Sequence, residues 1–229
     1  MAKHGKKYTE AVKKSTKPVY TVDQAMALIK DAAYAKFDES IDVNVNLGID
    51  ATKGDQAVRG SVLLPHTDKK VRVIVFAKGD YAAQAEKAGA DLVGAEDLVE
   101  KISNGWLDFD YAVATPDLMG LVGRLAKLLG PRGLLPNKKV GTVTFDVESI
   151  INDLKRGRAF FKNDKSGLVH FSIGKVSLDA NKLRENLETF VKALLAAKPS
   201  AAKGNFVKKL TVSSTMGIGV SIAVEELLH

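Results

Sequence analysis

The hydrophobic pattern of the chain changes twice along its length. Residues 41–48 read IDVNVNLG, a strict alternation of apolar and polar side chains, which indicates a strand with one buried and one exposed face. Residues 71–77 read VRVIVFA, a nearly continuous apolar run that indicates a strand buried on both faces. The alternating pattern returns after about residue 160. The sequence therefore predicts an antiparallel sheet at the two ends of the chain and a mostly buried sheet in the middle.

Further elements are expected in the two end segments. Thr21 stands three residues before Gln24, a capping-box pattern that predicts the start of an amphipathic helix. Apolar residues at 160–161 and 168–173 lie on either side of a turn at 163–167, which predicts a β-hairpin. Apolar spacing predicts a long helix over about 183–195, and strands are expected at about 61–64, 206–213 and 220–224.

The middle segment alternates between strands and helices. Strands are expected at 71–77, 92–93 and 111–114, and helices at 81–88, 96–103, 116–129 and from 147 to just before Gly157. Pro116 suits the first turn of a helix, because its missing N–H costs nothing there. Such alternation predicts parallel strands joined by crossover helices.

The simplest domain organisation is an insertion. One domain would be built from residues 1–67 and 160–229, and residues 68–159 would form a second domain attached to it by two connections. The predicted fold class is therefore α/β with two domains, and two connecting strands permit hinge motion between them.

A parallel α/β segment raises the alternative of a nucleotide-dependent enzyme. The first buried strand is followed by Ala77-Lys78-Gly79-Asp80-Tyr81, with one glycine where a dinucleotide fingerprint needs three. The segment GLLPNKK, which begins at Gly133, has Lys138 where a phosphate loop requires its second glycine. The four histidines lack metal-ligand spacing, and no G-x-S-x-G motif holds a serine nucleophile. We expect no catalytic activity, no metal, no cofactor and no small-molecule substrate.

The charge balance favours a polyanionic partner. The formal net charge is +7 and the pI is about 9.4. Residues 120–141 hold five basic residues and no acid, in a Gly/Pro-rich context that lets backbone amides approach phosphates. Residues 189–223 hold five lysines and no acid. A run of like charge is often only a solvated face, so both interpretations stay open here.

Localisation follows from what the sequence lacks. There is no cysteine, and no run approaches the roughly 18 apolar residues of a membrane span. Residues 1–17 are polar, with six lysines and one acid, unlike a secretory signal. We expect a cytoplasmic protein that does not bind membranes.

Three short segments have residue types suited to RNA contact. The turn at 163–167 combines small polar side chains with lysines, residues 213–217 read SSTMG, and Phe37 follows Lys36. Hydroxyls and amides can bind sugar and phosphate, and Met216 or Phe37 can pack against a base or a ribose. The alternatives are an ordinary turn, a core methionine and a core aromatic.

Seven motifs, in order and spacing, resemble the bacterial ribosomal protein L-one family, the protein of the mobile stalk on the large ribosomal subunit. They are KHGKKY, AKFDESIDVNVNLGID, VRG before LPH, DFDYAVATPDLMG, LGPRGLLPN, FKNDKSG and STMG. The resemblance covers essentially the whole chain. It implies a split two-layer α/β sandwich formed by both chain ends and an inserted Rossmann-like three-layer α/β domain that holds no nucleotide.

The resemblance also implies a function. The partners would be stalk rRNA of the large subunit, deacylated tRNA leaving the exit site, and the protein's own operon mRNA, whose translation it would repress. The RNA-binding residues would include Phe37, Asn163, Asp164, Lys165, Ser166, Gly167, Thr215, Met216 and Gly217, with Lys36, Glu39, Lys162, His170 and Ser214 as adjacent candidates. A secondary RNA contact is expected at Arg132, Lys138 and Lys139.

The sequence departs from the family pattern in a few places. It has Asn137-Lys138-Lys139 where members often have Asn-Pro-Lys, and serine where they have threonine at positions 166, 213 and 214. Serine keeps the hydroxyl, so hydrogen bonding is expected to survive. The missing proline leaves the conformation of the inserted domain's loop less defined.

Overall fold

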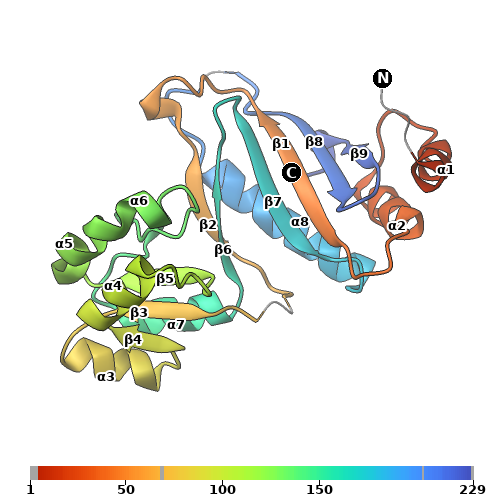
Figure 1. Cartoon of the computed structure of the whole chain (residues 1–229). Coiled ribbons are helices and arrows are strands. Elements are labelled where there is room, and N and C mark those ends of the chain that lie inside the picture. Colours follow the sequence, from red (N-terminus) through yellow and green to blue (C-terminus); the bar gives the residue numbers. More distant parts are fainter. Residues whose placement is uncertain (1–4, 68–69, 203, 228–229) are drawn as a thin grey trace. The chain divides into compact units, whose positions relative to one another are not determined.

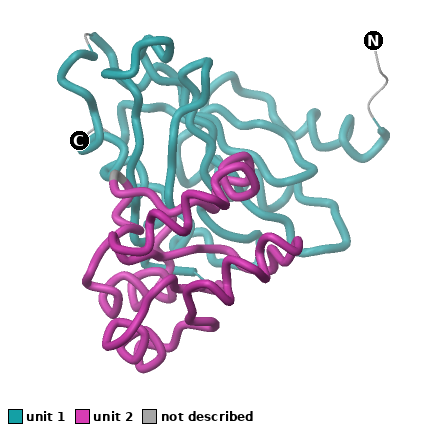
Figure 2. Tube along the Cα trace, turned by 60° about the vertical axis from the view of Figure 1, so that its left-hand side comes forward, with its two compact units in different colours: residues 1–68, 160–229 teal, residues 69–159 magenta. Residues whose placement is uncertain are grey.

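The chain divides at residues 68/69 and 159/160. The computed structural model describes residues 5–67, 70–202 and 204–227. Unit 1 comprises residues 1–68 and 160–229, and unit 2 comprises residues 69–159; Figure 2 colours them separately.

A four-stranded antiparallel sheet is the centre of unit 1, in the order β7-β1-β8-β9. Its strands are β1 (Ser40–Leu47), β7 (Leu168–Lys175), β8 (Val207–Ser214) and β9 (Gly219–Ile222). The apolar residues of the alternating segment, Ile41, Val43, Val45 and Leu47, are at most 2% exposed. The predicted half-buried strand is thus confirmed, and its polar residues face the other side of the sheet.

Helices cover the apolar face of this sheet. Helix α2 (Val22–Ala32) contacts β8 and β9, helix α8 (Ala180–Ala196) contacts β7, and the two helices contact each other (Figure 1). The Thr21 side chain caps α2 by accepting a hydrogen bond from the Gln24 amide at 3.4 Å, as the sequence predicts. The basic N-terminal segment contains a further helix, α1 (Lys6–Lys14), which contacts α2.

One polar side chain is fully buried between α8 and the sheet. Asn186 is 0% exposed, and its amide nitrogen donates to the carbonyl oxygens of His66 and Ile173, both at 2.7 Å. Its amide oxygen accepts from the His66 N–H at 3.1 Å. Asn186 therefore fixes the backbone of His66, close to the point where the chain leaves unit 1.

The predicted β-hairpin around residues 163–167 is wrong in its pairing. Strand β6 (Arg158–Lys162) pairs with β2 (Arg59–Leu63) in a separate two-stranded sheet, whereas β7 pairs with β1. A single bridge, Asn163 to Val169, joins the two sides of the turn. The turn itself is present, but each flanking strand has a partner from elsewhere in the chain.

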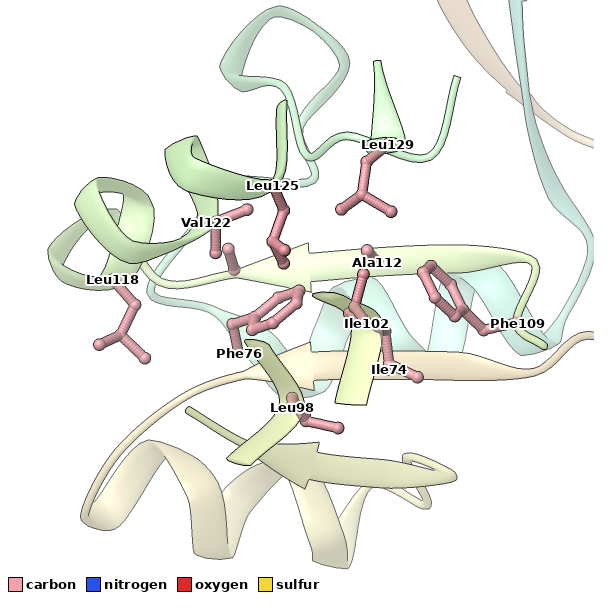
Figure 3. Packing of buried hydrophobic residues seen from close by; sticks show 11 residues of the cluster. Ile74, Phe76, Leu98, Ile102, Phe109, Ala112, Leu118, Val122, Leu125 and Leu129 are labelled. Carbon is pink, nitrogen blue, oxygen red and sulfur yellow. The ribbon is translucent and has the colours of Figure 1, made fainter. Parts of the chain in front are cut away.

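Unit 2 contains a parallel sheet in the order β4-β3-β5. Its strands are β3 (Val73–Phe76), β4 (Leu92–Gly94) and β5 (Tyr111–Ala114). All four residues of β3 are at most 1% exposed, as expected for a strand buried on both faces. Ile74 and Phe76 pack into an apolar cluster (Figure 3), whose other members include Leu98, Ile102, Leu118, Val122, Leu125 and Leu129.

Helices form the outer layers of unit 2. Helix α4 (Glu96–Ser103) contributes to the cluster on one face. Helix α3 (Asp80–Lys87) contacts β3 and also α7 (Val147–Lys155), whose start is capped by Asp146 accepting from the Ser149 amide at 3.3 Å. These layers confirm the predicted α/β fold class.

The single helix expected over residues 116–129 is instead a series of short helical segments and 3-10 turns. Two helical segments, α5 (Met119–Val122) and α6 (Ala126–Leu129), alternate with 3-10 turns at Pro116–Leu118 and Gly123–Leu125. Glycine disfavours a helix interior, and Gly120 and Gly123 both lie here. Leu118, Val122, Leu125 and Leu129 still bury their side chains, so packing holds the segment in place.

None of the helices within the described part of the chain is both long and apolar enough to span a bilayer.

Candidate nucleic-acid interface

Glu39 is a buried carboxylate that joins two distant segments of unit 1. It is 1% exposed, and its Oε1 accepts from the Ala35 amide at 2.8 Å while its Oε2 accepts from the Met216 amide at 3.1 Å. Burial raises the pKa of Glu39, but hydrogen bonds from the Ser214 hydroxyl and from the Ala35, Met216 and Tyr34 amides together outweigh it, so the net pKa is lowered. The carboxylate is therefore held charged in the folded protein.

The segment from Ser214 to Gly217 is fixed by hydrogen bonds to residues next to Glu39. The Thr215 amide donates to the Ser40 carbonyl at 3.0 Å, and the Thr215 hydroxyl accepts from the Ser40 amide at 3.0 Å. The Tyr34 hydroxyl donates to the Met216 carbonyl at 2.7 Å. Residues 34–40 and 214–217 together form what we call the Glu39 cluster.

Two large apolar side chains of the Glu39 cluster are exposed. Phe37 is 57% exposed and Met216 is 51% exposed, whereas Ser214 is 4% exposed. Phe37 also borders a hollow of about 290 Å³ that Lys30, Asp38 and Ser177 help to line. The core interpretation of Met216 and Phe37 is therefore wrong: both side chains are exposed, on a backbone that is held rigidly.

Gly217 is required by close packing inside this cluster. A Cβ at this position would lie 2.3 Å from the Ser214 hydroxyl oxygen, far closer than real atoms approach. The Gly217 amide donates to the Ser214 carbonyl at 3.1 Å, which closes a tight turn. The absence of a side chain at Gly217 thus leaves room for the Ser214 hydroxyl to hydrogen-bond to the Glu39 carboxylate.

The turn from Asn163 to Gly167, here called the Asp164 turn, is organised by an aspartate. Asp164 Oδ1 accepts from the Ser166 and Leu168 amides, both at 2.8 Å, and Gly167 has a positive φ of 78° that suits glycine. The pKa of Asp164 is lowered, chiefly by the Leu168 amide and further by the Ser166 amide and His170. Lys165 and Ser166 are exposed, whereas Gly167 is buried.

Asn163 anchors the Asp164 turn to the rest of unit 1. The Asn163 backbone N–H donates to the Val58 carbonyl at 3.0 Å, and the Asn163 side-chain oxygen accepts from the Val58 backbone N–H at 2.8 Å. The Leu47 amide donates to the Gly167 carbonyl at 3.0 Å. The turn therefore lies at the Leu47 end of β1.

The structure does not bring all the predicted residues into one cluster. The Glu39 cluster lies at the Ser40 end of β1 and the Asp164 turn at the Leu47 end, so about 23 Å of extended strand separates them. His170 lies between them: it pairs with Asn44 across the sheet, with its Nδ1 2.6 Å from Asn44 Oδ1 and its Nε2 3.8 Å from Asp164 Oδ2.

The surface between the two clusters is polar, and most of it was missed by sequence reasoning. On the sheet face opposite α2 and α8, cross-strand pairs bring together polar side chains that are partly or fully exposed. They are Asp42, Asn44, Asn46, His170, Ser172, Lys209, Thr211, Ser213 and Ser221, and we call this set the open sheet face. The signal was present in the polar half of the alternating strand, which indicated only an exposed face.

The remaining predicted residues lie in exposed positions. Lys36 precedes Phe37 and Lys162 precedes the Asp164 turn, and both are exposed. In unit 2, Arg132 and Lys138 are exposed in the loop after α6. The side chain of Lys139 falls outside the described residues. Among the residues that the structure describes, no group of histidine, aspartate or glutamate is arranged to hold a metal ion.

A rigid, polar and partly basic surface on a split α/β unit is consistent with the family that the motifs indicate. Residues 29–218 match the model of the ribosomal protein L1p/L10e family. The chain belongs to this family. The match includes the Glu39 cluster and the Asp164 turn and covers the whole of unit 2.

Membership of this family decides the general function. Members are structural ribosomal proteins that bind rRNA in the large subunit, so the chain is a ribosomal protein rather than an enzyme. The alternative of a nucleotide-dependent enzyme is thereby excluded. The same membership places the protein in the cytoplasm, within the large ribosomal subunit.

Proposed function

We propose that unit 1 is the RNA-binding domain and that rRNA lies along the open sheet face, held at one end by the Glu39 cluster and at the other by the Asp164 turn. The residues that contact RNA directly are Lys36, Phe37, Lys162, Lys165, Ser166, His170, Thr215 and Met216. Glu39, Ser214, Gly217, Asn163, Asp164 and Gly167 act by holding these residues in place.

The observation that carries this proposal is the bond between the Glu39 carboxylate and the Met216 amide. This bond and the bond from the Ala35 amide attach two loops to the same carboxylate. One loop carries the exposed Met216 thioether and the other the exposed Phe37 ring. Preorganised groups lose little conformational entropy on binding. RNA recognition by shape benefits from such a surface, because ribose and unstacked bases pack on apolar side chains.

Phosphate contacts supply the affinity in this account. The exposed lysines of unit 1 neutralise phosphates, and backbone amides and hydroxyls position the RNA. If about five phosphates are neutralised, log affinity falls with log salt at a slope of roughly −3.5 to −4.5. Filter binding of a stalk rRNA fragment over a range of salt concentrations tests this, and a flat response would contradict it.

Unit 2 adds a secondary, electrostatic contact with RNA. Residues 120–141 contain Arg124, Lys127, Arg132, Lys138 and Lys139 and no acid. We place this contact in the loop after α6, whose glycines allow close approach to phosphates. Charge reversal of Arg132 and Lys138 together is expected to weaken RNA binding less than any change in the Glu39 cluster.

The finer roles rest on the resemblance to the bacterial branch of the family. We infer that the protein belongs to this branch, that it binds the stalk rRNA, that it assists release of deacylated tRNA from the exit site, and that it represses translation of its own operon. The repressor role uses the same surface as rRNA binding, because one site that reads RNA shape serves both RNAs.

Competition tests the repressor role. A fragment of the protein's own operon mRNA is expected to displace a stalk rRNA fragment from the purified protein, and Met216→Asp is expected to weaken both complexes in parallel. If the mRNA fragment binds without displacing the rRNA, the two RNAs use different surfaces and the shared-site account is wrong.

A further inference from the structure

Two segments of unit 2 differ sharply in charge. Residues 91–110, which form β4, α4 and the approach to β5, contain six acids and one base; residues 120–141 contain five bases and no acid. The six acids are Asp91, Glu96, Asp97, Glu100, Asp108 and Asp110. Within unit 2, Glu96 pairs with Lys78 at 3.0 Å, Asp108 with Arg72 and Asp91 with Lys155 at 4.0 Å, whereas Asp97 and Glu100 are exposed on α4. Exposed carboxylates disfavour phosphates, so this face of α4 is suited to a different kind of partner.

Four residues of this segment line an open hollow. The hollow has a volume of about 430 Å³ and is lined by Leu92, Lys101, Asn104 and Trp106, all of which belong to residues 91–110. Trp106 is half-buried, and its ring centroid lies 5.6 Å from that of Phe109, which is 6% exposed. The indole is therefore supported from the apolar core while it lines the hollow, as is typical of aromatic anchors in protein interfaces.

A strand edge lies beside this hollow. Strand β4 is at the end of the sheet order and pairs with β3 alone among the strands that the structure describes. Its first residue, Leu92, is 36% exposed and also lines the hollow. An edge strand offers backbone N–H and C=O groups to an extended segment of another chain.

We propose that β4, α4 and the Trp106 hollow form a docking surface for a lysine- or arginine-rich extended segment of another protein. The segment adds a strand to the outer edge of β4 and places an apolar side chain against Trp106 and Leu92. Its cations face the carboxylates of Asp97 and Glu100, both of which are exposed on α4. The stem of Lys101 packs at the rim of the hollow while its ammonium group stays in water.

The single tryptophan of the chain gives a direct readout of this surface. The intact protein is titrated with a synthetic peptide in which lysine and valine alternate, and Trp106 fluorescence is followed. The expected result is a saturable change with this peptide, none with a peptide in which glutamate replaces lysine, and a weaker response when serine replaces valine. Absence of any response to the lysine–valine peptide would overturn the proposal.

A pair of charge-matched variants locates the binding. Asp97→Lys with Glu100→Lys is expected to weaken peptide binding at least about tenfold, because close opposite charges become like charges. Asp117→Lys with Glu148→Lys makes the same change of net charge elsewhere in unit 2 and is expected to change peptide binding by less than about twofold. Circular dichroism checks that both variants keep the fold.

Two results would contradict the proposal even if the peptide binds. Equal weakening by both pairs of substitutions would mean that the peptide follows overall charge rather than this surface. Sedimentation showing that the protein alone self-associates, with the Asp97→Lys and Glu100→Lys pair abolishing it, would mean that the surface takes a second copy of the chain.

Discussion

The Met216 amide donates a hydrogen bond at 3.1 Å to the Glu39 carboxylate, although 177 residues separate them in the sequence. The carboxylate is buried and also accepts from the Ala35 amide, so one side chain fixes two loops from opposite ends of the chain. The exposed Phe37 and Met216 side chains therefore depend on a group that does not itself reach the surface.

Substitution Glu39→Gln is expected to destabilise unit 1 and to weaken RNA binding. The amide nitrogen of glutamine cannot accept a hydrogen bond, so either the Ala35 or the Met216 amide loses its partner. An unsatisfied buried donor costs about 1–3 kcal/mol. Urea unfolding measures the first effect and filter binding the second; an exposed acid, Glu225, changed to glutamine is the control. RNA affinity that stays at the wild-type value would contradict a positioning role.

The lowered pKa of Glu39 predicts how stability depends on pH. Because its folded-state pKa lies below the ordinary value of 4.5, its contribution to the free energy of unfolding is fully present above that pH. The contribution is lost as the pH falls through the lower folded-state pKa, where the native state takes up its proton. Urea unfolding at pH values above and below 4.5 is expected to show a smaller loss of stability on acidification for Glu39→Gln than for the wild type.

Substitution Met216→Asp is expected to affect RNA binding rather than folding. The Met216 side chain is 51% exposed and takes no part in the hydrogen bonds of the Met216 backbone. The change in unfolding free energy should therefore stay within about 0.5 kcal/mol. RNA affinity is expected to fall at least about tenfold, or roughly 1.4 kcal/mol. Val19→Asp, at a side chain 50% exposed, is the matched control. Unfolding of the Met216 variant would show a core role instead.

Substitution Gly217→Ala tests the packing around the Glu39 carboxylate. The new Cβ would meet the Ser214 hydroxyl at 2.3 Å, so the hydroxyl must leave Glu39 or the turn must shift. We expect a loss of about 1–3 kcal/mol in unfolding free energy. Adding Ser214→Ala removes the colliding hydroxyl and should recover part of that loss. If Gly217→Ala alone is neutral, the close contact does not constrain this turn.

Substitution Asn186→Leu is expected to destabilise unit 1 by about 2–3 kcal/mol, because it leaves the N–H and C=O groups of His66 without their buried partner. Native-state hydrogen exchange should show faster exchange at His66. Glu185→Ala, which removes the exposed partner of the His66 ring at 2.6 Å, should change stability by less than about 0.5 kcal/mol. Similar effects of the two substitutions would argue against the proposed role of Asn186 in fixing the His66 backbone.

Much of the fold could be predicted because the local patterns agree with the tertiary structure. The alternation over residues 41–47 specified which side of β1 is buried, and the capping pattern at Thr21 specified the start of α2. The hairpin prediction was wrong because the pairing of a strand depends on residues far away in the sequence. Strand β6 pairs with β2 and strand β7 pairs with β1, so β6 and β7 do not form a hairpin with each other. Residues 116–129 kept their apolar spacing, but their glycines allowed 3-10 turns within the helix.

The sequence indicated candidate residues but not the geometry in which the structure places them. Glu39 stands between Asp38 and Ser40, where sequence alone indicates an exposed loop, and its burial depends on a segment 177 residues away. Asn44 and Thr211 become neighbours only through strand pairing. The open sheet face could therefore not be assembled from motifs, because no short stretch of sequence contains it.

Hydroxyl-radical footprinting of the protein with and without a stalk rRNA fragment tests the central claim most directly. If RNA spans the open sheet face, Phe37, His170 and Met216 lose reactivity together on binding, while Val19 is unchanged. Protection at only one end of β1, or protection over α2 and α8 instead of the open face, would contradict the account.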